Sequence, residues 1–135
     1  MSKKRAYDRH LFGWPYQYEH DRVGLIMAQG FRDAYSGHPI STDQDGLDVD
    51  HVIPLDWAWE HGADGWTRLQ QHHFASNIAN LAVTSAHLNR QKGSKGPDEW
   101  TPPNEADDTR YRIYIRRWRI LCDMYHLPMP DLKAT

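Results

Sequence analysis

The stretch LDVDHVIPL, from Leu47 to Leu55, decides how the rest of this sequence is interpreted. Apolar and polar residues alternate along it, which is typical of a strand with two different faces. Pro54 should end the strand, because proline has no N–H to give to a sheet. On a regular strand Asp50 and His51 point to opposite sides, so the two neighbours are expected to have different tasks.

A second strand and a helix are predicted downstream. Residues 80–84 form a short extended run, Ser85 is a typical helix cap, and Gly93 is placed to stop the helix over 86–91. Between the two strands, residues 56–74 are predicted to be helical in pieces, with breaks at Gly62 and Gly65. The middle of the chain is therefore predicted as strand, long insert, strand and helix.

The flanking regions are predicted to be mainly helical. Residues 1–18 resemble an arm with a compact turn, and 19–35 is predicted as a helix with an apolar stripe at positions 23, 26, 27 and 31. A short extended segment is expected at 38–42. Residues 109–125 are predicted as a final helix with an aromatic stripe. We expect one α+β domain over 1–135, with a small core at 47–93, a helical insert at 56–75, and helices wrapped around the core.

Composition restricts the class of protein. A length of 135 residues suits a single domain. Cys122 is the only cysteine, which excludes a disulfide within the chain and a cysteine-based zinc site. The charged start is followed by no apolar signal segment, and no run is long enough to span a membrane. These features predict a cytoplasmic protein without a membrane partner. The formal net charge is −2, but basic residues gather near both ends of the chain.

Four polar residues around the predicted strands match the needs of phosphodiester hydrolysis. His51 can act as a general base, because the ordinary pKa of histidine lies near neutrality. Asp50 offers a carboxylate oxygen and Asn89 an amide oxygen, and such ligands suit one Mg²⁺ or Mn²⁺ ion better than zinc. Asn80 could hold the loop backbone and so orient His51.

These residues carry a resemblance to a known family. The sequences DHVIPL at 50–55, NL at 80–81 and NRQK at 89–92 resemble the motif of the HNH (ββα-metal, His-Me finger) endonucleases. A branch of that family labelled as a domain of unknown function is similar over most of the chain, from Tyr7 to about Leu127. The further matching segments are 7–9, 12–13, 58–59, 62–63, 66, 74–75, 82–83, 93 and 100–104.

The resemblance implies a ββα-metal fold and endonuclease activity, with products that carry 5′-phosphate and 3′-hydroxyl ends. It assigns Asp50 and Asn89 to the metal ion, His51 to the base, Asn80 to support of the site, and Arg9 to the scissile phosphate. Asn89 stands where the family has its last metal-binding histidine. Exported relatives carry a secretion signal and a cysteine pair, and the absence of both here favours an intracellular substrate.

Basic residues predict where nucleic acid binds. Lys92 and Lys95, near the helix end, are candidates for phosphate contacts, although cations are favourable there in any protein. Arg112, Arg116 and Arg119 lie at i, i+4 and i+7 of the final helix, which fits a phosphate-binding face and a solvated face equally well. DNA is the expected substrate, with RNA left open, and a protein partner could supply sequence specificity.

Alternative interpretations remain at this stage. His87 is the main rival metal ligand. It stands two residues before Asn89, however, so the two side chains do not lie on the same face of the helix. The tryptophans at 57–66 could stack on bases, but packing of the insert onto the core is the favoured interpretation. The alternative function is a non-catalytic DNA-binding module or an accessory subunit of a phage packaging or defence complex.

Overall fold

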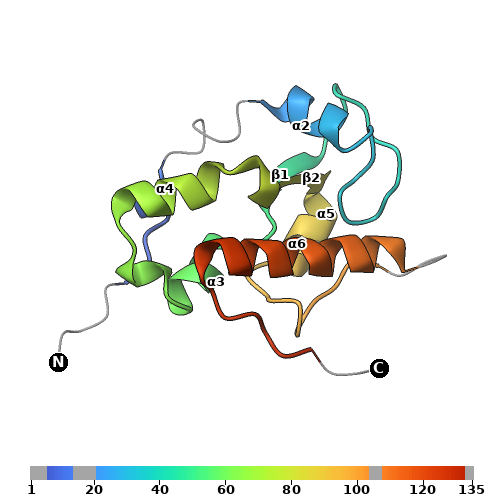
Figure 1. Ribbon diagram of the computed structural model, residues 1–135. Coiled ribbons are helices and arrows are strands. Elements are labelled where there is room, and N and C mark those ends of the chain that lie inside the picture. Colours follow the sequence, from blue (N-terminus) through green and yellow to red (C-terminus); the bar gives the residue numbers. More distant parts are fainter. Residues whose placement is uncertain (1–5, 14–20, 104–107, 133–135) are drawn as a thin grey trace.

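A two-stranded antiparallel sheet lies at the centre of the fold (Figure 1). The computed structural model describes residues 6–13, 21–103 and 108–132. Strand β1 (Leu47–His51) pairs with β2 (Leu81–Ser85) so that Leu47 lies opposite Ser85 and His51 opposite Leu81. Helix α5 (Ala86–Lys92) follows β2 directly and packs against both strands. The predicted order of strand, insert, strand and helix is confirmed, and so is the α+β class.

Local signals set the bounds of α5. The Ser85 side chain accepts a hydrogen bond from the Leu88 N–H at the start of the helix, which satisfies one of the N–H groups that have no partner within it. Gly93 ends the helix with a φ of 54°, a backbone conformation that favours glycine. Both features were predicted from the sequence, and they fix the position of every side chain on this short helix.

The insert between the strands consists of short helices. These are α3 (Leu55–Glu60), the 3-10 turn η2 (Ala63–Gly65), α4 (Arg68–Ser76) and the 3-10 turn η3 (Ile78–Asn80). Thr67 caps α4 in a reciprocal capping box with Gln70. The predicted breaks at Gly62 and Gly65 fall between α3 and α4, so this prediction is confirmed.

Helix α6 (Thr109–Tyr125) has the bounds that its aromatic stripe predicted. Tyr114, Trp118 and Leu121 are almost completely buried in the core. The Arg117 guanidinium donates hydrogen bonds to the carbonyls of Ala79 and Leu81, which fixes α6 to the start of β2. Figure 1 shows α6, in red, crossing in front of α5. No helix in the described ranges is long and apolar enough to cross a lipid bilayer.

The N-terminal half differs from its prediction. The expected helix over 19–35 is the shorter α2 (Arg22–Ala28), preceded in the chain by the 3-10 turn η1 (Arg9–Phe12). Three members of the expected apolar stripe are about half exposed, namely Val23, Met27 and Phe31. The chain leaves the helix because Gly30 and Phe31 adopt positive φ angles. No strand forms at 38–42, where a single bridge joins Arg32 to Pro39. Residues 14–20 lie outside the described part.

The turn after α2 closes the free edge of β2. The Gln29 side chain donates to the Val83 carbonyl and accepts from the Val83 N–H, as a neighbouring strand would. The buried Asp33 carboxylate accepts hydrogen bonds from the Thr84 hydroxyl and the Ser85 N–H. These contacts hold segment 29–35 against the sheet and bring Tyr35 within hydrogen-bonding distance of β1.

Candidate active site

Asp50, near the end of β1, accepts two hydrogen bonds on one carboxylate oxygen. The Tyr35 hydroxyl donates to Oδ2 over 2.7 Å, and the Lys92 Nζ lies 3.0 Å from the same atom. Lys92 also donates to the main-chain carbonyl of His51 over 2.9 Å. The Asp50 side chain is 12% exposed, and its Oδ1 has no hydrogen-bond partner among the residues described. One oxygen of Asp50 is therefore fixed and the other is open to a ligand.

His51 is buried and held in one orientation. Its Nε2 lies 2.8 Å from the Ala75 carbonyl oxygen, and only an N–H can donate to that oxygen. Nε2 therefore carries the proton, and Nδ1 of the neutral ring is the basic nitrogen. Burial lowers the pKa of His51 to about 4, with smaller contributions in the same direction from the charges of Arg9 and Lys92. The imidazole is consequently neutral at pH 7 and can accept a proton.

Asn80 holds the backbone that follows His51. Its side chain is completely buried, accepts a hydrogen bond from the Ile53 N–H over 2.8 Å, and donates to the Ile53 carbonyl over 3.3 Å. Its own carbonyl accepts from the Val52 N–H. The amide thus lies where the loop-supporting role expected from the sequence requires it, in contact with the loop and not with His51 itself.

Asn89 and Asp48 form a pair that the sequence analysis did not include. The Asn89 amide on α5 donates to Asp48 Oδ2 over 2.9 Å and makes no contact of this kind with Asp50. Asp48 lies two residues before Asp50 on β1, so the two carboxylates share one face of the strand. The alternation of residues 47–53 was the signal that could have identified Asp48. The donating amide nitrogen also leaves the Asn89 carbonyl oxygen available for a metal ion.

The chemistry of these oxygens fits a hard divalent ion. Asp50 and Asn89 offer a carboxylate and an amide oxygen, the ligand types that Mg²⁺ and Mn²⁺ prefer, and Asp48 holds the amide group of Asn89. Within the described ranges no cluster of three or more His, Cys, Asp or Glu side chains is arranged to hold a metal ion. His87, the rival ligand, is exposed and contacts Gln91 of its own helix.

The basic residues differ in their accessibility. Lys92 was expected to contact phosphate, but its side chain is fully buried and its ammonium pairs with Asp50, so an internal ion pair replaces the expected contact.

Lys95 is exposed and donates to the Gln91 carbonyl near the end of α5. The expected arginine face of α6 is exposed at all three positions, Arg112, Arg116 and Arg119. Arg9 is also exposed, and its charge acts on His51.

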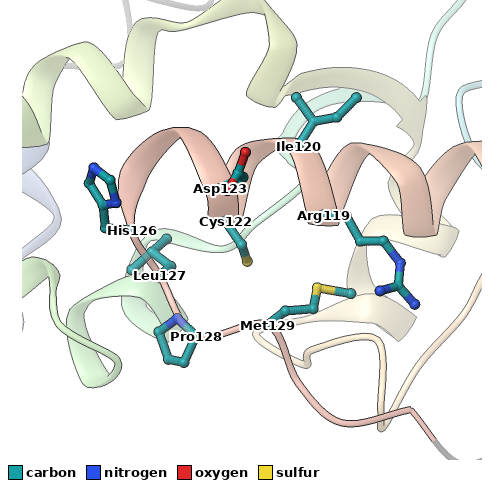
Figure 2. A pocket seen from close by; sticks show the side chains of 8 residues that line it. All are labelled: Arg119, Ile120, Cys122, Asp123, His126, Leu127, Pro128 and Met129. Atoms are coloured by element: carbon teal, nitrogen blue, oxygen red, sulfur yellow. The ribbon is translucent and has the colours of Figure 1, made fainter.

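A separate pocket of about 770 Å³ lies between α6 and the segment that follows it (Figure 2). Arg119, Cys122 and Met129 are among its lining residues. None of the candidate catalytic or metal-binding residues on β1, η3 or α5 lines it. This pocket therefore does not belong to the candidate active site.

Comparison with known proteins corrects the expected location. A curated relative from Arthroderma benhamiae (strain ATCC MYA-4681 / CBS 112371), described as an "Uncharacterized secreted protein", is 37% identical over 92 residues. The aligned region covers 66% of this chain and 43% of that relative, so it spans less than half of the relative's length. The expectation of a cytoplasmic protein is wrong in view of this secreted relative.

A family model identifies the chain more directly. The model of "GmrSD restriction endonucleases, C-terminal domain" matches residues 1–122, which includes β1, the insert, β2, α5 and most of α6. A match of this extent includes all the candidate site residues described above. The chain therefore belongs to the family of the C-terminal domain of GmrSD restriction endonucleases, a nuclease-related family.

Proposed function

We propose that this protein is a metal-dependent endonuclease of the HNH type, which hydrolyses phosphodiester bonds in DNA and leaves 5′-phosphate and 3′-hydroxyl ends. The observation that carries the proposal is the end of β1. There the neutral imidazole of His51 is held in one orientation on one face of the strand. Oxygen atoms gather on the other face, where Asp48, Asp50 and Asn89 lie. Membership of a restriction endonuclease family supports the same conclusion.

His51 acts as the general base in this proposal. The hydrogen bond from Nε2 to the Ala75 carbonyl fixes the ring, and Nδ1 takes a proton from the attacking water. Because the ring is buried and neutral, no proton has to be removed from it before it acts. The contacts of Asn80 with Ile53 fix the loop that leads away from this ring.

Asp50 Oδ1 and the Asn89 carbonyl oxygen would hold one Mg²⁺ or Mn²⁺ ion, and Asp48 is placed to orient the Asn89 amide. When bound, such an ion stabilises negative charge on the scissile phosphate and on the leaving 3′-oxygen. Arg9 is the proposed contact to the scissile phosphate. The exposed Lys95 and the arginine face of α6 would bind more distant phosphates through charge, without reading the base sequence.

Cleavage of plasmid DNA tests the proposal. Supercoiled plasmid incubated with the protein and Mg²⁺ should become open-circular before linear product appears, because one site cuts one strand at a time. EDTA should abolish the reaction, and ligatable ends would identify the 5′-phosphate and 3′-hydroxyl products. A gel time course and sequencing of the cut ends provide both measurements.

Two results would contradict this proposal. Full cleavage in the presence of EDTA would exclude the metal requirement. DNA binding without any cleavage, across Mg²⁺, Mn²⁺ and a range of salt concentrations, would favour a non-catalytic binding module. Binding should weaken steeply as salt rises, since release of counterions from DNA drives phosphate-mediated association.

Variants of Asn89 test the metal site separately from cleavage. Asn89→Ala should weaken Mn²⁺ binding by about 10-fold or more, because it removes a ligand oxygen and leaves Asp48 without its partner. Asn89→His should restore much of the affinity, since the resemblance places histidine at this position in relatives. Titration with Mn²⁺ measures both effects.

His87→Ala is the matched control at an exposed position of the same helix, and its Mn²⁺ affinity should equal that of the wild type. Equal affinity of wild type and Asn89→Ala would refute the assignment of Asn89. Loss of affinity in His87→Ala would instead identify His87 as the ligand.

A further inference from the structure

Lys92 contacts both residues of the Asp50-His51 pair with one ammonium group. It lies 3.0 Å from Asp50 Oδ2 and donates to the His51 carbonyl over 2.9 Å, with none of its side chain exposed. Burial of a lysine is costly unless its charge is paired and its N–H groups are hydrogen-bonded. These two contacts provide that pairing, and they join the side chain of one residue to the backbone of the next.

Tyr35 completes the same cluster from another segment of the chain. Its hydroxyl donates to Asp50 Oδ2 over 2.7 Å, and the Lys92 Nζ lies 5.9 Å from the centre of its ring. Tyr35 itself is held by the turn at Asp33, whose carboxylate accepts from the Tyr35 N–H over 2.8 Å. Two donors from separate segments, the turn and α5, therefore converge on one oxygen atom.

We propose that Lys92 and Tyr35 are positioning residues that reserve Asp50 Oδ2 and leave only Oδ1 for the metal ion. This inference rests on the proposed function, in which Asp50 is a metal ligand. A carboxylate with both oxygens free can bind one ion through two oxygens or bridge two ions. With Oδ2 fixed by two donors, Asp50 can do neither, and it holds a single ion through one oxygen in a fixed direction.

The charge of Lys92 has a second effect. An internal cation beside a metal ligand repels a divalent ion and so weakens its binding, while the same contact fixes the geometry that catalysis requires. The cluster should therefore lower the affinity for the metal ion and, at the same time, fix the orientation of Asp50. A residue with a merely structural role would not do this, because its loss would lower metal affinity and activity together.

The experiment compares Lys92→Met and Tyr35→Phe with wild type. Lys92→Met should bind Mn²⁺ at least about threefold more tightly, since the repelling charge is removed. Its kcat for plasmid nicking at saturating Mn²⁺ should fall by about 10- to 100-fold, since Asp50 and the His51 carbonyl lose their common donor. Tyr35→Phe should retain Mn²⁺ affinity at least equal to the wild-type value and lose about 10-fold in kcat. KM for DNA should not change in either variant.

Tyr114→Phe is the matched control. Tyr114 packs against Tyr35 with ring centres 5.6 Å apart and is equally buried, but within the described part of the chain its hydroxyl makes no hydrogen bond. Its kcat and Mn²⁺ affinity should remain at wild-type values. Tyr35→Phe keeps the buried ring and the ion pair, so it tests the inference even where Lys92→Met fails to fold.

The outcomes separate this inference from the proposed function. Weaker Mn²⁺ binding together with lower kcat in both variants, or wild-type kcat in both, would overturn the positioning role. If the wild-type protein cuts no DNA, the proposed function fails. Unchanged or tighter Mn²⁺ binding in Tyr35→Phe and tighter binding in Lys92→Met would then still support the reserved oxygen of Asp50, and weaker binding would overturn it.

Discussion

Replacing His51 with alanine should lower kcat for DNA cleavage by about 10²- to 10⁴-fold, the usual effect of removing a general base. Binding of Mn²⁺ and of DNA should persist, because the proposed ligand Asp50 lies on the other face of β1 and the other ligand, Asn89, lies on α5. Single-turnover cleavage at saturating Mn²⁺, combined with a Mn²⁺ titration, measures the two effects separately. Loss of Mn²⁺ binding in His51→Ala with retention in Asp50→Ala would reverse the proposed roles.

The burial of His51 requires a control for folding. His51→Gln keeps an N–H that can donate to the Ala75 carbonyl, but it supplies no base, so it should be stable and as inactive as His51→Ala. His61→Ala alters an exposed histidine that stacks on Trp57, and its activity should match the wild type. Substantial cleavage by His51→Gln would show that the imidazole is not the base.

Removal of the Asn80 side chain should have the largest effect on stability. Asn80→Ala leaves the N–H and the carbonyl of Ile53 buried without partners, which costs on the order of 3 kcal/mol of unfolding free energy. Activity should fall as well, because the loop after His51 is no longer held. Urea denaturation, followed by tryptophan fluorescence, measures the change.

Asn77 provides the comparison for Asn80. It lies three residues earlier, is partly exposed, and caps η3 by accepting from the Ala79 N–H. Asn77→Ala should cost only about 1 to 2 kcal/mol, because it removes the cap and the hydrogen bond that Asn77 donates to the Tyr125 hydroxyl but leaves no fully buried backbone group without a partner. If Asn80→Ala were no less stable than Asn77→Ala, the buried contacts of Asn80 would not hold the loop.

The parts of the fold that were predictable depend on local signals. Ser85 and Gly93 define α5 within the sequence itself, and the aromatic stripe defines α6 because it repeats over several turns. The prediction of a helix over 19–35 was wrong about its length, because the end of this helix depends on tertiary contacts. Gln29 turns away from α2 to bond Val83, a residue far along the chain, and no local pattern contains that information.

The sequence nominated the residues of the candidate site but could not predict their contacts. The motif points to Asp50 and Asn89, yet the hydrogen-bond partner of Asn89 is Asp48 and not Asp50. The burial of Lys92 could not be predicted from the sequence either. A lysine in the last turn of a helix is ordinarily a solvated cation, and only the packing of α5 against β1 reveals that this one is internal.

The closed edge of β2 has a consequence for behaviour at high concentration. A two-stranded sheet has two edges, and unpaired edges can recruit strands from other molecules and start aggregation. Here the Gln29 side chain pairs with the N–H and the carbonyl of Val83 on the edge of β2, whereas on β1 the Arg22 guanidinium donates to the Leu47 carbonyl alone. The edge of β2 is therefore closed at its central residue, which should hinder intermolecular strand addition on that side in concentrated solutions.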